Sequence, residues 1–455
     1  MATPQVSIVQ ALKAKPQTEE EIKEARKVWD KLDVKIEYTG RVITLPAEPS
    51  DMPIDKAIEH LERVRKDQEQ PYAVHEVFDA YPHDAAVAFV KALQQLYGWV
   101  SFETDIIKTF FGDIKEPPQM ISVKTGLGPH DMVQCPMGKI RLPGMKDSIK
   151  TQFWQPSRGA PHVFLVHGEI RKKDRHVVLE LATLARRLLK EESIYRGKPL
   201  RLRVGDDGTL DTNTPPEFLD VREMTEDSLL FDEDIKDQIH TNVLVPIKRT
   251  EICRSHNIPL KRTILLDGPF GTGKSLTARM VARVAENHNW TFILIDRIQG
   301  LKVALEFANR YAPAIVFGED IDRIASERND EMNDLINVID GVISKKAEIM
   351  TILTTNFLEK LDPVILRPGR LDAVITIRPP GPKTVELLIR HYAGALLHTD
   401  EDLTQSGLEL KGQIPATIRE SVERAKLCMI GRNDTKLVDH DIVIAGQTMK
   451  AHLDA

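Results

Sequence analysis

Cysteines are scarce in this chain and long apolar runs are missing, which narrows the classes of protein to consider. Only Cys135, Cys253 and Cys428 occur in 455 residues. They are too few and too scattered for a disulfide framework or a zinc cluster, and they favour a reducing compartment. No apolar run approaches the roughly 18 residues of a membrane-spanning helix, and the N-terminus has no signal-peptide core. We therefore expect a cytoplasmic protein without a membrane segment.

Aromatic residues are also few, and basic residues are slightly outnumbered by acidic ones. Aromatics make up 5% of the chain, but 42% of its residues are hydrophobic, which is enough for ordinary cores. The net charge of −6 does not mark the whole protein as nucleic-acid binding. The length suits two or three domains.

One glycine-rich motif carries most of the functional information. Gly268-Pro269-Phe270-Gly271-Thr272-Gly273-Lys274-Ser275 has the pattern G-x-x-x-x-G-K-S of a phosphate-binding loop. Its glycines let backbone N–H groups turn toward phosphate oxygens, the lysine reaches the β- and γ-phosphates, and the serine ligates Mg²⁺. An apolar run precedes it, and a helix-forming stretch that begins at Leu276 adds an N-terminal dipole. The sequence predicts a nucleoside triphosphate site here.

Polar residues follow two further apolar runs downstream. Residues 314–318 form a buried-strand pattern that ends in Glu319 and Asp320, and residues 350–355 form another that ends in Asn356. Carboxylates after a buried strand are typical of the magnesium and water half of a phosphoryl-transfer site. Strand, loop and helix alternate, which predicts a parallel sheet with helices on both faces.

Together these motifs resemble the AAA family of ring-forming ATPases over residues 225–455. The resemblance implies a large P-loop α/β domain at 225–382 and a small lid at 383–455 with helices at 383–397, 415–429 and 441–453. It also implies an intersubunit signalling turn at Asp340-Gly341-Val342. In the lid, His391 matches an adenine-side position, and Ala416 belongs to a loop that contacts nucleotide in the family.

The resemblance also implies roles for the site residues. Ser275 and Glu319 would organise Mg²⁺, Asp320 would polarise the attacking water, and Asn356 would position it as sensor 1. Arg367 and Arg370, three residues apart beside proline and glycine, match paired arginine fingers that reach the γ-phosphate bound by a neighbouring subunit. Such fingers require head-to-tail association into a homo-oligomeric ring, which in the family is a hexamer.

The carboxylate pair departs from the usual order of Asp then Glu. The order Glu319-Asp320 is most similar to the branch of the family that contains the mitochondrial chaperone of respiratory complex III assembly. Aspartate in place of glutamate shortens the water-polarising side chain by one methylene, about 1.5 Å. Slow hydrolysis of ATP is therefore one alternative. A second register makes Asp320 the magnesium-side residue and leaves Ile321 at the catalytic position.

The interval between Ile295 and Pro313 is a second departure. In threading unfoldases of the family, this interval carries a pore loop with an aromatic residue. Here Ile298, Leu301 and Lys302 are the side chains available to grip a client, and no aromatic accompanies them. We therefore expect no processive threading of polypeptides.

The first half predicts a helical region at 1–118, a basic α+β module at 119–203 and an acidic linker at 204–224. An amphipathic helix is expected at 171–192. Residues 139–203 hold 16 Lys/Arg and 6 Asp/Glu, and residues 204–238 hold 2 and 12. The basic stretch has two interpretations. It binds nucleic acid or an acidic partner, or it is a solvated helix face whose charge is offset by the acidic linker.

Three functions remain open from the sequence. The leading hypothesis is an ATPase that remodels or assembles a protein client recognised by the N-terminal half. The alternatives are a nucleic-acid-associated motor or loader that uses residues 139–203, and a nucleotide-dependent oligomeric scaffold with slow turnover.

Overall fold

The computed structural model divides into two compact units, residues 1–70 and 71–455. The structure describes residues 35–38, 41–44, 62–98, 100–109, 112–157, 162–205, 210, 214–322, 347–361, 363, 366–367 and 369–453. The first unit contains an antiparallel pair, β1 (Lys35–Tyr38) and β2 (Arg41–Thr44). The predicted signalling turn at 340–342 lies outside the described residues.

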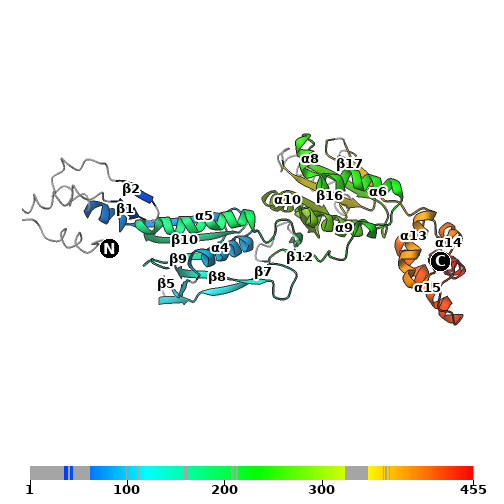
Figure 1. Cartoon of the computed structure of the whole chain (residues 1–455), viewed down its shortest axis with the longest axis horizontal. Helices are drawn as coiled ribbons and strands as arrows, with labels where there is room; N and C mark the ends of the chain where they lie inside the picture. Colours follow the sequence, from blue (N-terminus) through cyan, green and yellow to red (C-terminus); the bar gives the residue numbers. More distant parts are fainter. Residues whose placement is uncertain are drawn as a thin grey trace, which may run out of the picture. The chain divides into compact units, whose positions relative to one another are not determined.

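The second unit begins with an antiparallel sheet in the order β3-β10-β9-β8-β4, and β7 also pairs with β8 (Figure 1). Helices α4 (Pro82–Tyr97) and α5 (Arg175–Glu191) pack against each other and share a core with the sheet. The amphipathic helix predicted at 171–192 is thus present as α5. The strands are β3 (Pro71–Phe78), β4 (Ser101–Glu103), β7 (Gln119–Lys124), β8 (Met132–Arg141), β9 (Ile149–Trp154) and β10 (Val163–Arg171). A separate hairpin consists of β5 (Asp105–Thr109) and β6 (Gly112–Glu116).

This N-terminal module, residues 71–191, differs from the predicted division at residue 118. β3 and β4 belong to the same sheet as β8 to β10, although the sequence placed residues 1–118 in a helical region. In β3, Val74 and Phe78 are buried and Tyr72 and Glu76 of the same face are partly buried, while the side chains between them are exposed. Eight residues of such alternation are a weak local signal, and only pairing with β10 makes a strand of them.

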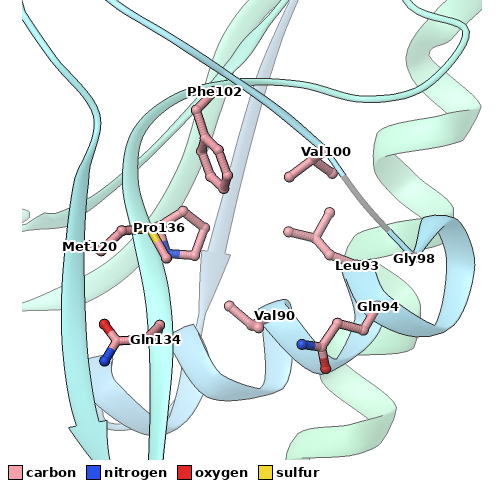
Figure 2. A pocket seen from close by; sticks show the side chains of 9 residues that line it. All are labelled: Val90, Leu93, Gln94, Gly98, Val100, Phe102, Met120, Gln134 and Pro136. Atoms are coloured by element: carbon pink, nitrogen blue, oxygen red, sulfur yellow. The ribbon is translucent and has the colours of Figure 1, made fainter.

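An apolar groove opens in the N-terminal module where α4 ends (Figure 2). Its volume is about 350 Å³. The side chains of Val90, Leu93 and Phe102 point into it. The full lining is Val90, Leu93, Gln94, Gly98, Val100, Phe102, Met120, Gln134 and Pro136.

The C-terminal half contains a seven-stranded sheet in the order β12-β11-β14-β15-β16-β13-β17 (Figure 1). All neighbours are parallel except β11 and β12. Along β13, Ile264 and Leu266 belong to one hydrophobic cluster and Leu265 to another, so the sheet is buried on both faces. The strands are β11 (Pro199–Leu202), β12 (Glu217–Phe218), β13 (Arg262–Asp267), β14 (Thr291–Ile295), β15 (Ala314–Gly318), β16 (Ile349–Thr355) and β17 (Ala373–Thr376).

Helices cover both faces of this sheet, as the sequence predicted. α10 (Leu301–Arg310) contributes to the cluster that contains Leu265. α6 (Glu233–Ile239), α7 (Val245–Lys248) and α9 (Lys274–Asn287) contribute to the other. The domain is therefore a P-loop α/β fold.

The predicted domain boundaries at residues 203 and 224 do not match the edge of this sheet. β11 was assigned to the basic module and β12 to the acidic linker, but β11 extends the sheet in parallel with β14 and β12 closes its edge. β11 pairs with a strand some ninety residues away, so no local pattern marks it as part of the ATPase sheet.

The C-terminal helices pack around a core of their own. They are α13 (Pro382–Ala393), α14 (Thr404–Glu409), α15 (Pro415–Gly431) and α16 (Asp439–Leu453). The sequence predicted helices at 383–397, 415–429 and 441–453 and missed the six-residue α14. Across the described residues, no helix is both long and apolar enough to cross a bilayer.

A buried polar junction joins the N-terminal module to the sheet. Asp84, 1% exposed, accepts hydrogen bonds from Ser193 Oγ (2.6 Å) and Ile194 N (3.0 Å), and it also hydrogen-bonds the hydroxyl of Tyr311. That hydroxyl accepts the N–H of Tyr81 (3.0 Å). Burial raises the pKa of Asp84, and these hydrogen bonds act in the opposite direction.

The same junction holds the chain just before β15. Arg196 donates to the carbonyl oxygens of Ala312 (2.6 Å) and Arg310 (3.0 Å). Arg310 in turn forms an ion pair with Asp79 (3.2 Å), immediately ahead of α4. The module therefore contacts the ATPase sheet through buried side chains as well as through β11.

Two tyrosines of the junction provide a matched test of its hydrogen bonds. We expect Tyr311→Phe to lower the free energy of unfolding by about 1–3 kcal/mol, because it leaves the Tyr81 N–H buried without its acceptor. Tyr195 is buried beside Tyr311, but its hydroxyl has no hydrogen-bond partner among the residues that the structure describes. Tyr195→Phe should leave the free energy unchanged or raise it. Urea unfolding of both variants checks this, and equal losses would contradict the assignment.

Candidate nucleotide site

The predicted site residues meet at one edge of the seven-stranded sheet. β15, β16 and β13 are parallel neighbours, so their carboxyl ends lie side by side. The phosphate loop follows β13, the carboxylate pair follows β15, and Asn356 follows β16. In open α/β sheets, ligands bind outside the carboxyl ends of the strands.

Two glycines of the loop are required by their surroundings. A Cβ on Gly268 would lie 2.2 Å from the carbonyl oxygen of Ile377, which no side chain tolerates. Gly273 has φ of 108° and packs against the ring of Phe231, to which a Cβ would come within 3.2 Å. The loop then enters α9 at Lys274, so the N-terminal dipole of α9 faces the loop.

Lys274 lies inside the loop. Its Nζ donates to the carbonyl oxygens of Gly268 (2.5 Å) and Pro269 (2.8 Å), and its side chain is buried. Burial lowers the pKa of the Lys274 ammonium, whereas nearby carboxylates, Asp320 foremost, act to raise it. The geometry holds one positive charge where the loop would hold phosphate oxygens.

The carboxylate pair is divided between two partners. Ser275 Oγ donates to Glu319 Oε1 (2.6 Å), and Asn356 Nδ2 donates to Asp320 Oδ1 (2.9 Å). Glu319 therefore lies beside Ser275, and Asp320 lies beside the Asn356 amide. This arrangement corresponds to the assignment in which Glu319 is the magnesium-side residue and Asp320 polarises the water. The hydroxyl and carboxylate oxygens of Ser275 and Glu319 are hard donors that suit Mg²⁺.

The two arginines lie in the turn between β16 and β17. Arg370 N donates to the carbonyl oxygen of Arg367 (3.1 Å), which closes the turn. Arg367 is exposed and Arg370 is partly exposed.

The lid contacts the loop at one of its two predicted positions. A Cβ on Gly271 would lie 2.8 Å from Ile414 Cδ1 and 3.8 Å from the Cβ of Ala416. Ala416 is thus adjacent to the loop. His391, the other predicted position, lies exposed on α13 with its ring edge-on to Tyr392.

Three site contacts were not predicted. Phe231, which lies just ahead of α6, packs against Gly273. Asp322 Oδ1 accepts the N–H of Asn356 (3.0 Å), a role that the Glu-Asp-Ile-Asp run could have suggested. The Phe270 ring lies edge-on to Phe357 at 5.7 Å, which no local pattern indicates.

The apolar side chains of the interval after β14 are not exposed. Ile298 and Leu301 are 4% and 2% exposed, and a Cβ on Gly300 would lie 2.4 Å from a Val204 methyl group. The two apolar side chains considered for gripping a client are therefore part of the core. Changing them to serine would disturb folding rather than test grip.

Residues 264–379 match the family model described as "ATPase family associated with various cellular activities (AAA)". This part of the chain is an AAA domain. It carries the phosphate loop, the carboxylate pair, Asn356 and both arginines. The lid and the N-terminal module lie outside the matched residues.

Curated relatives match less than half of the chain. The 26S proteasome regulatory subunit 8 homolog of Schizosaccharomyces pombe is 34% identical over 38% of this chain and 50% of its own length. The proteasome-activating nucleotidase of Aeropyrum pernix is 31% identical over 48% and 58%. The ATP-dependent zinc metalloprotease FtsH of Helicobacter pylori is 33% identical over 39% and 32%. The chain thus spans about half the length, or less, of these relatives.

Proposed function

We propose that the protein hydrolyses ATP between copies of itself in a ring and uses the cycle to remodel or assemble a protein client. The observation that carries this proposal is the pairing of Ser275 with Glu319 and of Asn356 with Asp320 beside Lys274. The similarity to proteasomal nucleotidases supports it.

The proposed mechanism assigns one task to each group. The Lys274 ammonium and the loop amides hold the phosphates, and Ser275 and Glu319 would hold Mg²⁺. Mg²⁺, when bound, neutralises charge on the β- and γ-phosphate oxygens. The Asp320 carboxylate polarises the attacking water, and Asn356 fixes that carboxylate through its 2.9 Å hydrogen bond.

The arginines act in trans in this proposal. Arg367 and Arg370 of one copy spread the transition-state charge at the loop of its neighbour. Each interface then joins the phosphate loop of one copy to the arginine turn of the next copy. This contact is heterologous, and it closes into a ring. Six copies and a cytoplasmic location follow from the resemblance and the composition.

The client contact is placed on the N-terminal module. The apolar side chains of the segment after β14, Ile298 and Leu301, are buried and therefore cannot grip a client. The module is joined to the ATPase sheet by β11 and by the Asp84–Tyr311 junction, and the chain from Tyr311 leads through β15 to Glu319. A client bound to the module is therefore connected through the chain to β15, the strand that precedes Glu319 and Asp320.

The charge distribution favours a protein client over nucleic acid. Seven basic side chains of residues 139–203 form ion pairs with acidic groups outside that stretch, and only one of these, Glu217, comes from the predicted linker. The pairs are Lys139–Asp105, Arg141–Glu103, Lys150–Asp105 and Glu116, Arg186–Glu76, Lys198–Glu286, Arg201–Asp296 and Arg203–Glu217. Neutralised charge contributes little to phosphate binding.

The order of the two carboxylates supports a more specific proposal, an assembly chaperone with slow turnover. Glu319-Asp320 is the order that resembles the complex III assembly branch, and a shorter Asp320 favours slow turnover over rapid hydrolysis. An assembly chaperone needs few cycles per client, so this order fits assembly better than processive work.

Replacing Lys274 tests the nucleotide site. Lys274→Ala should weaken ATP affinity about 10- to 100-fold, because a charge-assisted phosphate contact contributes about 1.5–3 kcal/mol. Lys274→Met keeps the buried volume and should give the same loss. Lys302→Ala, at an exposed position on α10, is the matched control. Calorimetry measures affinity and circular dichroism confirms folding. Wild-type affinity in folded Lys274→Met would reject the site.

A further inference from the structure

Asp320 has a backbone conformation that needs support. Its φ is 53°, in the left-handed region. The other described non-glycine residues with positive φ are asparagines: Asn257, Asn289 and Asn433. A side chain in this region is held there by its surroundings, and such residues gather at functional sites.

Thr354 supplies that support. The parallel ladder between β15 and β16 ends at the pair Gly318 and Leu353. Beyond it, the Asp320 N–H donates to the side-chain oxygen of Thr354 (3.0 Å), and the Ile321 N–H donates to the Thr354 carbonyl (2.9 Å). Thr354 is 2% exposed, so water cannot replace its hydroxyl.

The resulting turn points the Asp320 carboxylate at Asn356. Oδ1 of Asp320 accepts Asn356 Nδ2 at 2.9 Å, and the Asn356 backbone is itself fixed by Asp322. A carboxylate one methylene shorter than glutamate reaches about 1.5 Å less far, so its backbone must place it. The left-handed turn at Asp320 does so.

We propose that Thr354 is a positioning residue for ATP hydrolysis. Its hydroxyl holds Asp320 in the left-handed conformation that brings the short carboxylate to Asn356 and the attacking water. This inference rests on the proposed function and goes beyond it by assigning Thr354 a part in turnover without contact to nucleotide.

The test compares three threonine variants. Thr354→Val removes the acceptor at nearly constant volume and should lower kcat about 10- to 100-fold, because misplacement by about 1 Å costs that much. ATP affinity should stay at the wild-type value. Thr354→Ser keeps the acceptor and should retain most of kcat. Thr351→Val, at another buried position of β16, is the matched control and should be fully active.

A double-mutant cycle shows whether Thr354 acts through Asp320. In the Asp320→Asn background, Thr354→Val should cause no further loss of single-turnover rate. An equal fold-loss in both backgrounds, or wild-type kcat in Thr354→Val, would overturn the inference. Thermal unfolding checks that the variants are folded, and Thr354→Ala replaces Thr354→Val if that variant is not.

The outcomes separate this inference from the proposed function. An inactive Asp320→Asn variant together with a fully active Thr354→Val variant overturns the role of Thr354 alone. Full turnover in Asp320→Asn overturns both. A crystal structure of Thr354→Val provides a readout independent of activity, since φ at residue 320 should leave the left-handed region.

Discussion

Alanine in place of Arg367 or Arg370 is expected to leave ATP affinity unchanged and to lower kcat by about 10³- to 10⁵-fold. The loss is large because the guanidinium stabilises charge that develops only in the transition state. Affinity is preserved because the phosphates are held by the loop of the adjacent copy. Arg187→Ala, at an exposed position on α5, is the control and should keep full activity.

Mixing variants tests whether the arginines act in trans. Arg367→Ala protein keeps its phosphate loop, and Lys274→Ala protein keeps its arginines. A mixed ring contains interfaces that pair an intact loop with an intact arginine, so the mixture should hydrolyse ATP although neither variant does so alone. Light scattering at the assay concentration reports the oligomeric state. A monomer that hydrolyses ATP at the wild-type rate would contradict the trans assignment.

Asp320→Asn is expected to retain ATP and Mg²⁺ but to lower kcat by about 10²- to 10⁴-fold, the range of general-base contributions. The amide keeps the shape of the carboxylate and loses its charge. Glu319→Gln should instead weaken the magnesium dependence of ATP binding, because Glu319 lies 2.6 Å from Ser275. Nucleotide affinity with and without Mg²⁺, measured beside kcat, separates the two effects.

The reverse pattern would favour the second register. If Asp320→Asn impaired magnesium-dependent binding and Glu319→Gln did not, Asp320 would be the magnesium-side residue. Asp322→Asn is a useful comparison, because Asp322 accepts hydrogen bonds from the Thr355 hydroxyl and the Asn356 backbone N–H rather than from the Asn356 side chain. It should affect kcat less than Asp320→Asn. Full activity in Asp320→Asn would reject both registers.

The nucleotide site could be predicted largely from the sequence because its parts are local. The loop from Gly268 to Ser275 is continuous, and Glu319, Asp320 and Asn356 each end an apolar run that forms a strand. Parallel strands bring such ends to one edge, so chain order alone predicted their proximity. The lid helices could be predicted for the same reason, except the short α14.

The N-terminal boundaries could not be predicted from the sequence because they depend on distant pairing. β11 joins a strand some ninety residues away, and β3 pairs with β10 across a similar distance. The charge pattern could not be interpreted locally for the same reason, since acidic partners of the basic stretch come from distant strands such as β4 and β6.

The sequence by itself determined that this protein has a P-loop α/β domain with a candidate ATP site and a helical lid, because those features are encoded in short contiguous patterns. Only the tertiary structure decided which carboxylate faces Ser275 and which faces Asn356. It also decided that Ile298 is buried and that Thr354 holds Asp320 in a left-handed turn. These features depend on side-chain direction between neighbouring strands, which residue spacing does not encode.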